Sequence, residues 1–432
     1  MNDNTIKLLN LDHISNRLES IETLHSSREL KVIIRLKKEL SPCPVCTIET
    51  EKVHDYQTKH ITHSISTNHR CHIIYKARRY RCRNCQKVFF EHNPFSGYYE
   101  SISSYTKLTI LEHLRSYTNT FTSAALLYHT SIQTVINIFD QHVDMKRKPL
   151  PEYICMDEFF TAKVSKYKYA CMLTDFQTHQ VINIYATRHK KYLIESIGRI
   201  PKSERKRVKG VIIDMWDTYK ETIELCFPKA RIAIDSFHVI RSLNEAMRQI
   251  RIEVMNKYNK RTSSLEANDS YYYMLKKFHY FFIKDYEKIY KGLIKIPKFN
   301  AHWFKADIMN YLLAIDERLR VAYRLKEAYR TFNKSADKKT CDIEFDQLIQ
   351  QFKNHEHQSY RDFGRMIERW KEEIKNSFIR INGRRLSNGS IEGMNSRVKT
   401  IIKSANGIKD FYRMRNRIMY SLNQNSPIKY KK

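Results

Sequence analysis

Short apolar runs bounded by turn-forming residues dominate the chain between residues 151 and 238. Five of these runs have the length and composition of β-strands, and a stretch with helical periodicity, residues 191–200, precedes the fourth. The predicted strands cover residues 153–160, 167–174, 181–186, 210–213 and 231–234. This mixture predicts a domain of the α/β or α+β class.

Helical periodicity dominates on both sides of this predicted sheet. The helical pattern covers residues 104–144 before the sheet and residues 239–378 after it, and the second stretch is also rich in charged residues and tyrosine. Residues 145–151 contain two prolines after basic residues, which is typical of a linker. A length of 432 residues allows several domains of this kind.

A helix-turn-helix pattern lies within residues 123–139. A short helix and a two-residue turn are followed by Ser131, a good N-cap for a second helix. The second helix has two faces, an apolar one with Ile132, Val135, Ile136 and Phe139 and a polar one with Gln133, Thr134 and Asn137. Such polar side chains can hydrogen-bond base edges in a major groove. An ordinary helical hairpin shares the pattern, but the basic chain around it favours DNA binding.

The charge of the chain narrows the choice of partner. Lysine and arginine number 77 against 46 acidic residues, and residues 375–432 alone carry 14 basic and 2 acidic residues. The net charge of +31 indicates a polyanionic partner, of which nucleic acid is the commonest. No apolar run reaches the length of a membrane span, and the N-terminus lacks a signal-peptide pattern. We therefore expect a cytoplasmic, nucleoid-associated protein that binds DNA and no membrane.

Two C-x-x-C pairs carry four of the nine cysteines. Cys43 pairs with Cys46 and Cys82 with Cys85, with 35 residues between the pairs. Two such pairs can hold one tetrahedral Zn²⁺, and four thiolates leave no open position for water, so the zinc would be structural. A redox role needs one pair near a βαβ unit, so a zinc ribbon is favoured. Cys71 is an alternative ligand, but it fits a small buried thiol better.

Three of the predicted strands end in, or run into, an aspartate: Asp157, Asp214 and Asp235. Aspartate is depleted in strands and costly to bury unpaired, so three such positions indicate a shared site near the strand ends. Clustered carboxylates repel one another unless a cation lies between them, and oxygen ligands suit Mg²⁺ or Mn²⁺. For any one of these aspartates, capping of the following helix is an alternative.

A fourth acid, Glu392, stands at the start of a predicted helix, where the helix dipole favours an ionised carboxylate. Asn395, Lys399 and Lys403 follow on the same side of this helix. The preference of acids for a helix start accounts for Glu392 alone. It does not account for the neighbouring cations, which can bind phosphates.

The motifs in their order resemble a known family. After the cysteine pairs and the helix-turn-helix come Met-Asp157-Glu158-Phe, Ile-Asp214-Met, Asp235-Ser-Phe-His238-Val and Asn388-Gly-Ser-Ile-Glu392-Gly-Met-Asn. This order is similar to that of bacterial insertion-sequence transposases of the ISL-three group, over about residues 43–420. The resemblance implies a DDE transposase whose RNase H-like catalytic domain is interrupted by an all-α insertion before the final Glu.

The resemblance also implies which residues act. The implied catalytic and metal-binding triad is Asp157, Asp214 and Glu392, holding two Mg²⁺ or Mn²⁺ ions. In an RNase H-like sheet the first and fourth strands are neighbours, which brings Asp214 closer than Asp235 to Asp157. Asp235 would then orient His238 or a water molecule behind the ligands. Asp217 and Asp235 stay open as rivals for the second position.

The implied organisation is multidomain and α+β. We expect an N-terminal segment (1–40), a zinc ribbon (41–95), a helix-turn-helix DNA-binding domain (96–150), the first part of the catalytic domain (151–238), a helical insertion (239–382) and the last part of the catalytic domain with the basic C-terminus (383–432).

The expected activity is metal-dependent DNA cleavage followed by attack of the freed 3′-hydroxyl on target DNA. The partners would be the terminal inverted repeats and target DNA, and the pairing of two ends suggests a homodimer. The basic side chains expected to hold phosphates are Arg397, Lys399, Lys403, Arg413, Arg415 and Arg417.

Two other functions stay open on the sequence. His238-Val-Ile-Arg241 has the His-x-x-Arg spacing of tyrosine recombinases, with tyrosines at 271–273 downstream, but that function leaves the aspartates unexplained. A non-catalytic zinc-ribbon and helix-turn-helix regulator, or a transposase relic, would be free to lose the acids, yet all are present.

Overall fold

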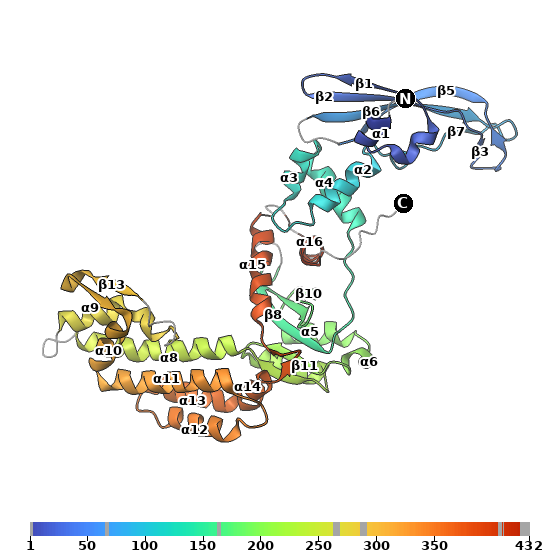
Figure 1. Ribbon diagram of the computed structural model, residues 1–432. Coiled ribbons are helices and arrows are strands. Elements are labelled where there is room, and N and C mark those ends of the chain that lie inside the picture. Colours follow the sequence, from blue (N-terminus) through green and yellow to red (C-terminus); the bar gives the residue numbers. More distant parts are fainter. Residues whose placement is uncertain are drawn as a thin grey trace. The chain divides into compact units, whose positions relative to one another are not determined.

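The structure, a computed structural model, is mixed α/β (Figure 1). It describes residues 3–64, 69–161, 166–261, 268–285, 292–404, 408 and 410–423, without the side chains of Asp3, Ser390 and Glu392. The chain forms two compact units. Unit 1 comprises Met1–Lys146, Thr161–Lys166 and Ser396–Lys432, and unit 2 comprises Arg147–Phe160 and Tyr167–Asn395.

Unit 1 begins with two short helices and a five-stranded sheet. The elements are α1 (Asp3–Leu8), η1 (Asp12–Arg17), β1 (Leu18–His25), β2 (Glu29–Leu36), β5 (Val53–Thr62), β6 (Arg70–Arg81) and β7 (Val88–Phe90). The order is β1-β2-β6-β5 with β7 also paired to β6; β2 and β6 are parallel, and the other neighbours are antiparallel. Alternate residues Val32, Ile34, Ile73 and Tyr75 are fully buried on one face. The first 40 residues therefore share a sheet and a core with the cysteine-containing segment.

Three helices follow this sheet, and a fourth comes from the end of the chain. They are α2 (Ser104–His113), α3 (Phe121–Leu127), α4 (Ile132–His142) and α16 (Phe411–Leu422). The predicted turn between α3 and α4 is confirmed, because His129 has a positive φ of 51°. The predicted cap is confirmed as well: the side chain of Ser131 accepts a hydrogen bond from the backbone N–H of Thr134.

The buried face of α4 is rotated from the predicted one. Val135 and Phe139 are buried as expected, but Ile132 is 45% exposed and Ile138 is buried in its place. The buried face also contacts α16, from the far end of the sequence, where the ring of Tyr420 lies 5.8 Å from that of Phe139. A local pattern could not anticipate that neighbour.

Unit 2 is built around a second five-stranded sheet. Its elements are β8 (Tyr153–Phe160), β9 (Tyr169–Asp175), β10 (Val181–Tyr185), α5 (Lys190–Gly198), α6 (Lys202–Arg205), β11 (Gly210–Ile213), α7 (Asp217–Cys226) and β12 (Arg231–Ile234). The order is β10-β9-β8-β11-β12, antiparallel from β10 to β8 and parallel from β8 to β12. The five predicted strands are confirmed, and so is the prediction that the first lies beside the fourth.

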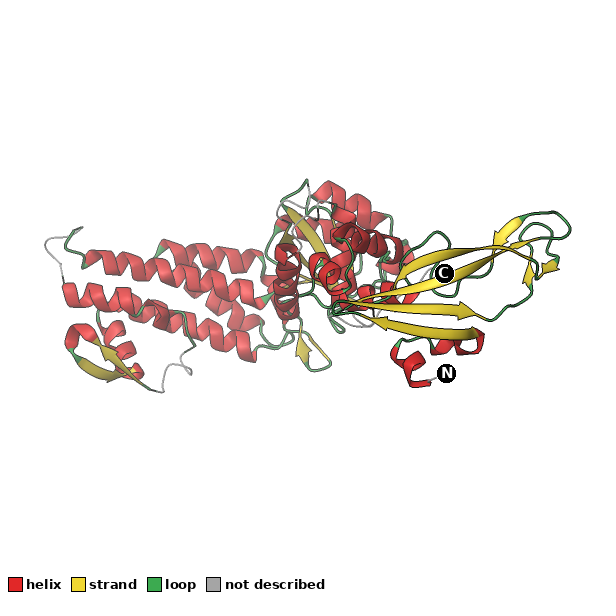
Figure 2. Ribbon diagram, turned by 90° about the horizontal axis from the view of Figure 1, so that it is seen from above, coloured by secondary structure: helices red, strands yellow, loops and turns green. Residues whose placement is uncertain are grey.

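A long, mainly helical segment follows β12 (Figure 2). It contains α8 (Ser236–Lys257), α9 (Asp269–Lys277), η2 (His279–Phe282), β13 (Leu293–Ile296), η4 (Pro297–Phe299), β14 (Ala301–Phe304), α10 (Lys305–Ala314), α11 (Glu317–Ser335), α12 (Asp342–Lys353), α13 (Gln358–Arg369) and α14 (Lys371–Ser377). A hairpin of β15 (Arg380–Ile381) and β16 (Arg384–Arg385) leads to α15 (Gly389–Ser404). The first residues of α15 belong to unit 2 and the later ones to unit 1.

The expectation of an all-α insertion is wrong, because β13 and β14 form a hairpin within it. Ile294 lies opposite Trp303, and the Trp303 ring stacks on Phe299 at 5.5 Å between centroids. Asn300 turns the chain with a positive φ of 45°. Strands of four residues alternate too briefly to stand out from the helical sequence around them.

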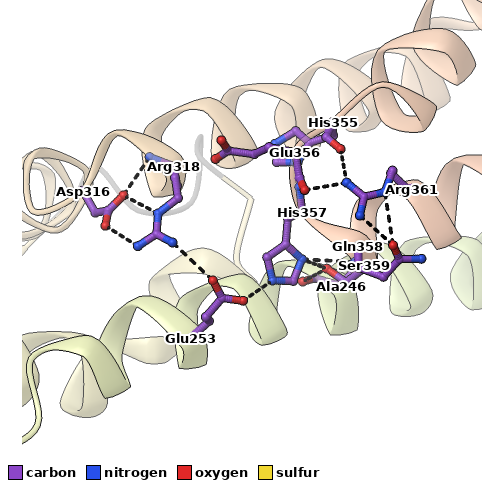
Figure 3. A network of polar contacts seen from close by, with 10 residues as sticks. All are labelled: Ala246, Glu253, Asp316, Arg318, His355, Glu356, His357, Gln358, Ser359 and Arg361. Carbon is purple, nitrogen blue, oxygen red and sulfur yellow. Dashed lines mark hydrogen bonds and ion pairs between the residues drawn. The ribbon is translucent and has the colours of Figure 1, made fainter. Parts of the chain in front are cut away.

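A polar network joins three helices of this segment, α8, α11 and α13 (Figure 3). Glu253 of α8 accepts from Arg318 at 3.2 Å with one oxygen and lies 2.8 Å from Nε2 of His357 with the other. His357 caps α13, and Ser359 donates to the carbonyl oxygen of Ala246 in α8 at 3.0 Å. The network fixes α13 against α8.

Candidate active site and metal centre

The four cysteines of the two C-x-x-C pairs converge on one point in unit 1. The first pair lies in a small hairpin of β3 (Ser41–Pro42) and β4 (Glu49–Thr50). In each pair the first cysteine closes a turn with its backbone N–H: Cys43 donates to Ile48 at 3.0 Å and Cys82 to Lys87 at 2.9 Å. A residue with positive φ follows each pair, Thr47 at 61° and Gln86 at 58°. The two pairs therefore have matching local geometry.

The four sulfur atoms all lie within 4.8 Å of one another, so they can hold one metal ion. The Sγ atoms of Cys43 and Cys85 are 3.5 Å apart, as are those of Cys46 and Cys82. Zinc–sulfur bonds of about 2.3 Å in a tetrahedron place the sulfurs about 3.8 Å apart, close to these distances. A hydrogen bond from the Ile48 backbone lowers the pKa of Cys46 to about 6, which favours its thiolate, whereas desolvation and the three neighbouring thiols raise the pKa of Cys85 to about 12.

Cys71 does not belong to this group. It is 2% exposed in the core of the first sheet, and burial raises the pKa of its thiol to about 12. The alternative in which Cys71 replaces a zinc ligand is therefore wrong, and Cys71 is a core residue.

The acids at the strand ends lie on neighbouring strands of unit 2. Asp157 is within β8, whereas Asp214 and Asp235 directly follow β11 and β12. The backbone N–H of Asp235 continues the ladder by donating to Ile213 at 3.0 Å. Asp235 occupies the N-cap position of α8, but its side chain makes no capping hydrogen bond. The capping alternative therefore does not account for this carboxylate.

Asp157 is in an environment that opposes its ionisation. Burial and then the charge of Asp214 raise the pKa of Asp157 to about 7. Its two oxygens are held separately: Oδ1 accepts from the backbone N–H of Glu158 and Oδ2 from the side-chain amide of Asn395, both at 2.7 Å. The hydrogen bonds fix the orientation of the carboxylate, and each oxygen keeps a lone pair that a cation can take.

His238 lies between the other two acids. Its Nδ1 is 2.9 Å from an oxygen of Asp214 and 3.7 Å from Oδ2 of Asp235. These contacts, that with Asp214 first, raise the pKa of His238 to about 10. Oδ2 of Asp235 is buried without a hydrogen-bond partner among the described residues. Asp217, in contrast, is half exposed and pairs with Arg369 at 2.7 Å. Its surroundings therefore differ from those of the other acids.

Glu392 lies in the first turns of α15, and its side chain is outside what the structure describes. Asn395, one turn further along α15, is the residue that contacts Asp157. The start of α15 therefore lies against β8 in unit 2.

A family model described as a transposase, of the ISL3 group of DDE transposases, matches residues 154–418. The chain belongs to this family. No curated protein matches the chain significantly. The matched range includes β8, β11 and α15, and hence the acids described above. Within the residues that the structure describes, none of the helices combines the length and the apolar character that crossing a lipid bilayer requires.

In this family member the polar face of α4 is accessible. Gln133 and Asn137 are exposed, and the amide of Gln133 donates to Asn137 at 2.7 Å. Thr134 is partly buried, with its hydroxyl 2.7 Å from that of Ser131. Gln133 and Asn137 can exchange their mutual hydrogen bond for one to a base.

The predicted phosphate-binding residues fall into two groups. Three are exposed on α15: Arg397, Lys399 and Lys403. The arginines of α16 have partners within unit 1: Arg413 pairs with Asp140 at 2.6 Å, and Arg415 donates to the carbonyl oxygen of Met145 at 2.7 Å. Arg417 is 2% exposed and donates to backbone carbonyls, so the expectation of phosphate contact is wrong for Arg417.

The sequence analysis missed a cleft beside Asp214, with a volume of about 830 Å³. Asp214 and Trp216, directly after β11, line it together with residues of α8, His238 among them, and of α13. The sequence signal for this cleft is Trp216, a large aromatic residue two positions after Asp214.

Proposed function

We propose that this protein is the transposase of a bacterial insertion sequence, which binds the ends of its element and catalyses metal-dependent DNA cleavage and strand transfer. The observation that carries the proposal is the placement of Asp157 and Asp214 on neighbouring parallel strands, with α15 bonded to Asp157 through Asn395. The strand order 3-2-1-4-5 in chain order supports an RNase H-like catalytic domain.

Asp157, Asp214 and Glu392 would hold two Mg²⁺ or Mn²⁺ ions. The residues fit such ions, because Asp157 and Asp214 repel each other as anions and a cation relieves this. When bound, the ions activate the attacking oxygen and stabilise the leaving oxygen of an in-line displacement. A helix places residues i and i+3 on the same side, so the backbone position of Glu392 on α15 suits this role.

The remaining polar groups would keep the carboxylates in position. Asn395 and the Glu158 backbone fix the two oxygens of Asp157. Asp235 is nearly buried and faces His238, which contacts Asp214 at 2.9 Å. In this arrangement Asp235 orients His238, and His238 limits the rotation of Asp214 while it holds metal.

DNA binding would rest on unit 1. A zinc ion in the four-cysteine site would stabilise the first sheet, and Gln133, Thr134 and Asn137 would contact bases. Arg397, Lys399 and Lys403 would contact phosphates. We propose a homodimer that pairs two element ends, and a cytoplasmic location near the nucleoid.

The test uses a plasmid that carries the DNA bordering the gene on both sides. With Mg²⁺, the wild-type protein should release element ends with free 3′-hydroxyls and join them to target DNA, without a covalent protein–DNA link. Asp157→Asn, Asp214→Asn and Glu392→Gln should each abolish cleavage but keep end binding, whereas the matched control Asp217→Asn should behave like wild type.

Three outcomes would contradict parts of the proposal. Wild-type cleavage by Glu392→Gln would remove Glu392 from the triad. Cleavage through a covalent tyrosine link would support a recombinase of the other class. Binding without cleavage by the wild-type protein, in either metal, would support a regulator or a relic.

A further inference from the structure

Asp214 and His238 lie at one part of the cleft, but the proposed chemistry does not use the rest of it, and its size excludes an ion alone as its ligand. A volume of about 830 Å³ is that of a site for an organic group. It opens next to Asp214 and lies wholly within unit 2. Whatever enters it is therefore held beside the reacting DNA.

The charged side chains of the cleft are mostly paired with one another or with neighbours, which leaves few free cations for a phosphate backbone. Its lining carboxylates are Glu158, Asp214, Glu245 and Asp362. Two arginines line it, Arg188 and Arg241, and Arg188 is already paired with Glu158 at 2.8 Å. Glu245 is likewise paired with Arg248 at 2.6 Å and Asp362 with Arg365. Asp214 contacts His238 at 2.9 Å, so most cations at the cleft are already engaged by a carboxylate. An uncharged part of the DNA fits better.

The apolar lining is planar and polarisable. Trp216, Phe363 and Met366 contribute it, from the sheet side and from α13. Aromatic rings and thioethers are the groups against which a flat heterocycle packs well. Hence the cleft combines apolar faces for a ring with polar groups for its edge.

The walls of the cleft are rigid. The guanidinium carbon of Arg188 lies 4.8 Å from the Trp216 ring and 4.3 Å from the Tyr169 ring. The Trp216 ring also packs edge-on with Tyr219 at 4.7 Å. On the other wall, Ser359 ties α13 to α8 through Ala246 (Figure 3). A preformed site of this kind loses little entropy when it binds.

We propose that the cleft receives one unpaired nucleobase of the DNA that is being cut, stacked on Trp216. The inference rests on the proposed function and adds a subsite to it. A duplex is too wide for the cleft, so the base has to leave the stack before it enters. Stacking on Trp216 then offsets part of the cost of unpairing.

The test compares cleavage rates on two kinds of DNA for each variant. One is the intact element end, and the other carries an abasic nucleotide at one position beside the cut, moved one nucleotide at a time. Trp216→Ala should cut intact DNA between about five- and 150-fold more slowly than wild type. At the position whose base enters the cleft, the ratio of the two rates should fall to near one, because no base is left to stack.

Two further variants make the result specific. Trp303→Ala makes the same change at a tryptophan that does not line the cleft, and its rate ratio should not depend on the abasic position. Ser242→Leu narrows the cleft from α8 without touching Trp216, and should reproduce the Trp216→Ala pattern if the latter variant folds poorly.

The outcomes separate the inference from the proposed function. A Trp216→Ala defect that is equal on every substrate, together with an unaffected Ser242→Leu variant, would overturn the inference and leave the transposase proposal standing. Failure of the wild-type protein to cut any of the substrates would instead contradict the proposed function.

Discussion

The two candidate metal sites of this protein are built in different ways. The cysteine site comes from two turns of matching geometry, each of which presents both of its ligands within four residues. The carboxylate site takes one acid from the middle of β8, one from the end of β11 and, in our proposal, one from α15. The first site is encoded locally, whereas the second exists only once a sheet has formed.

The two sites also differ in what holds them together without metal. Thiols can approach within 3.5 Å while they are neutral. Two carboxylates repel each other as anions in a small space, and burial together with the charge of Asp214 raises the pKa of Asp157 to about 7. The fold around the carboxylates is held by apolar strands that are buried on both faces. We therefore expect loss of zinc to affect folding and loss of a carboxylate to affect activity alone.

The largest effect should come from the second aspartate. Asp214→Asn removes a metal ligand of the proposed site and should lower the cleavage rate at least about 1000-fold in Mg²⁺ or Mn²⁺. Asp235→Asn should leave measurable cleavage, because Asp235 acts through His238. Thermal unfolding should be nearly unchanged for Asp214→Asn, and cleavage assays with both metals measure the ranking. The reverse ranking would make Asp235 the second triad acid.

The cysteine site should give the next effect, on folding instead of chemistry. Cys43→Ser or Cys82→Ser should lower the zinc content from one ion per chain to none, and with it the thermal stability of unit 1 and specific DNA binding. Cys71→Ala is the matched control: it removes a buried thiol of the same sheet and should keep the zinc. Elemental analysis measures the metal, and a well-folded wild-type protein without zinc would refute the assignment.

The same contrast explains what the sequence could predict. The cysteine pairs and the strands β8, β11 and β12 carry their signal within a few consecutive residues, and they were found at their observed positions. The contact of Tyr420 with α2 and that of Arg417 with the segment after α2 join residues about 300 positions apart and have no local signal. A basic residue in a basic segment looks the same whether it is exposed or buried.

The cleft was missed for a related reason. Trp216 and Phe363 are far apart in the sequence and meet only because α13 packs on α8 near the sheet. The β13–β14 hairpin was missed because each strand has four residues. The roles of the predicted site residues stay predictions, since they concern DNA and metal ions.

Arg417 allows a sharper comparison between local and long-range encoding. Its guanidinium donates to the carbonyl oxygens of Ser116 at 2.9 Å and Asn119 at 2.8 Å, and also contacts that of Leu114. Arg417→Met removes the donor to the carbonyls of Ser116 and Asn119, while Leu114 keeps the hydroxyl of Ser421 at 3.3 Å, and the loss should destabilise unit 1 by about 2–4 kcal/mol. Chemical denaturation monitored by the signal of unit 1 measures the loss.

Arg417→Lys is the informative companion to this variant. An ammonium keeps the charge but cannot reach three carbonyls in one plane, so it should restore only part of the stability. Full stability of Arg417→Met would contradict the structural role. For the same reason, residues 1–150 alone lack α16 and should bind element ends less well than a fragment joined to residues 396–432.

The smallest effect concerns the exposed lysines of α15. Lys399→Ala and Lys403→Ala remove side chains that face solvent, so neither should change the stability of unit 1. If each ammonium neutralises one phosphate, each variant should reduce the slope of log affinity against log salt by about 0.9, equally for element ends and unrelated DNA. Lys353→Ala is the control, since Lys353 is already paired with Glu368 at 2.8 Å and should leave the slope unchanged. A loss of affinity confined to element ends would instead mean that these lysines contact bases, and a slope unchanged by the double variant would remove α15 from the DNA-binding surface.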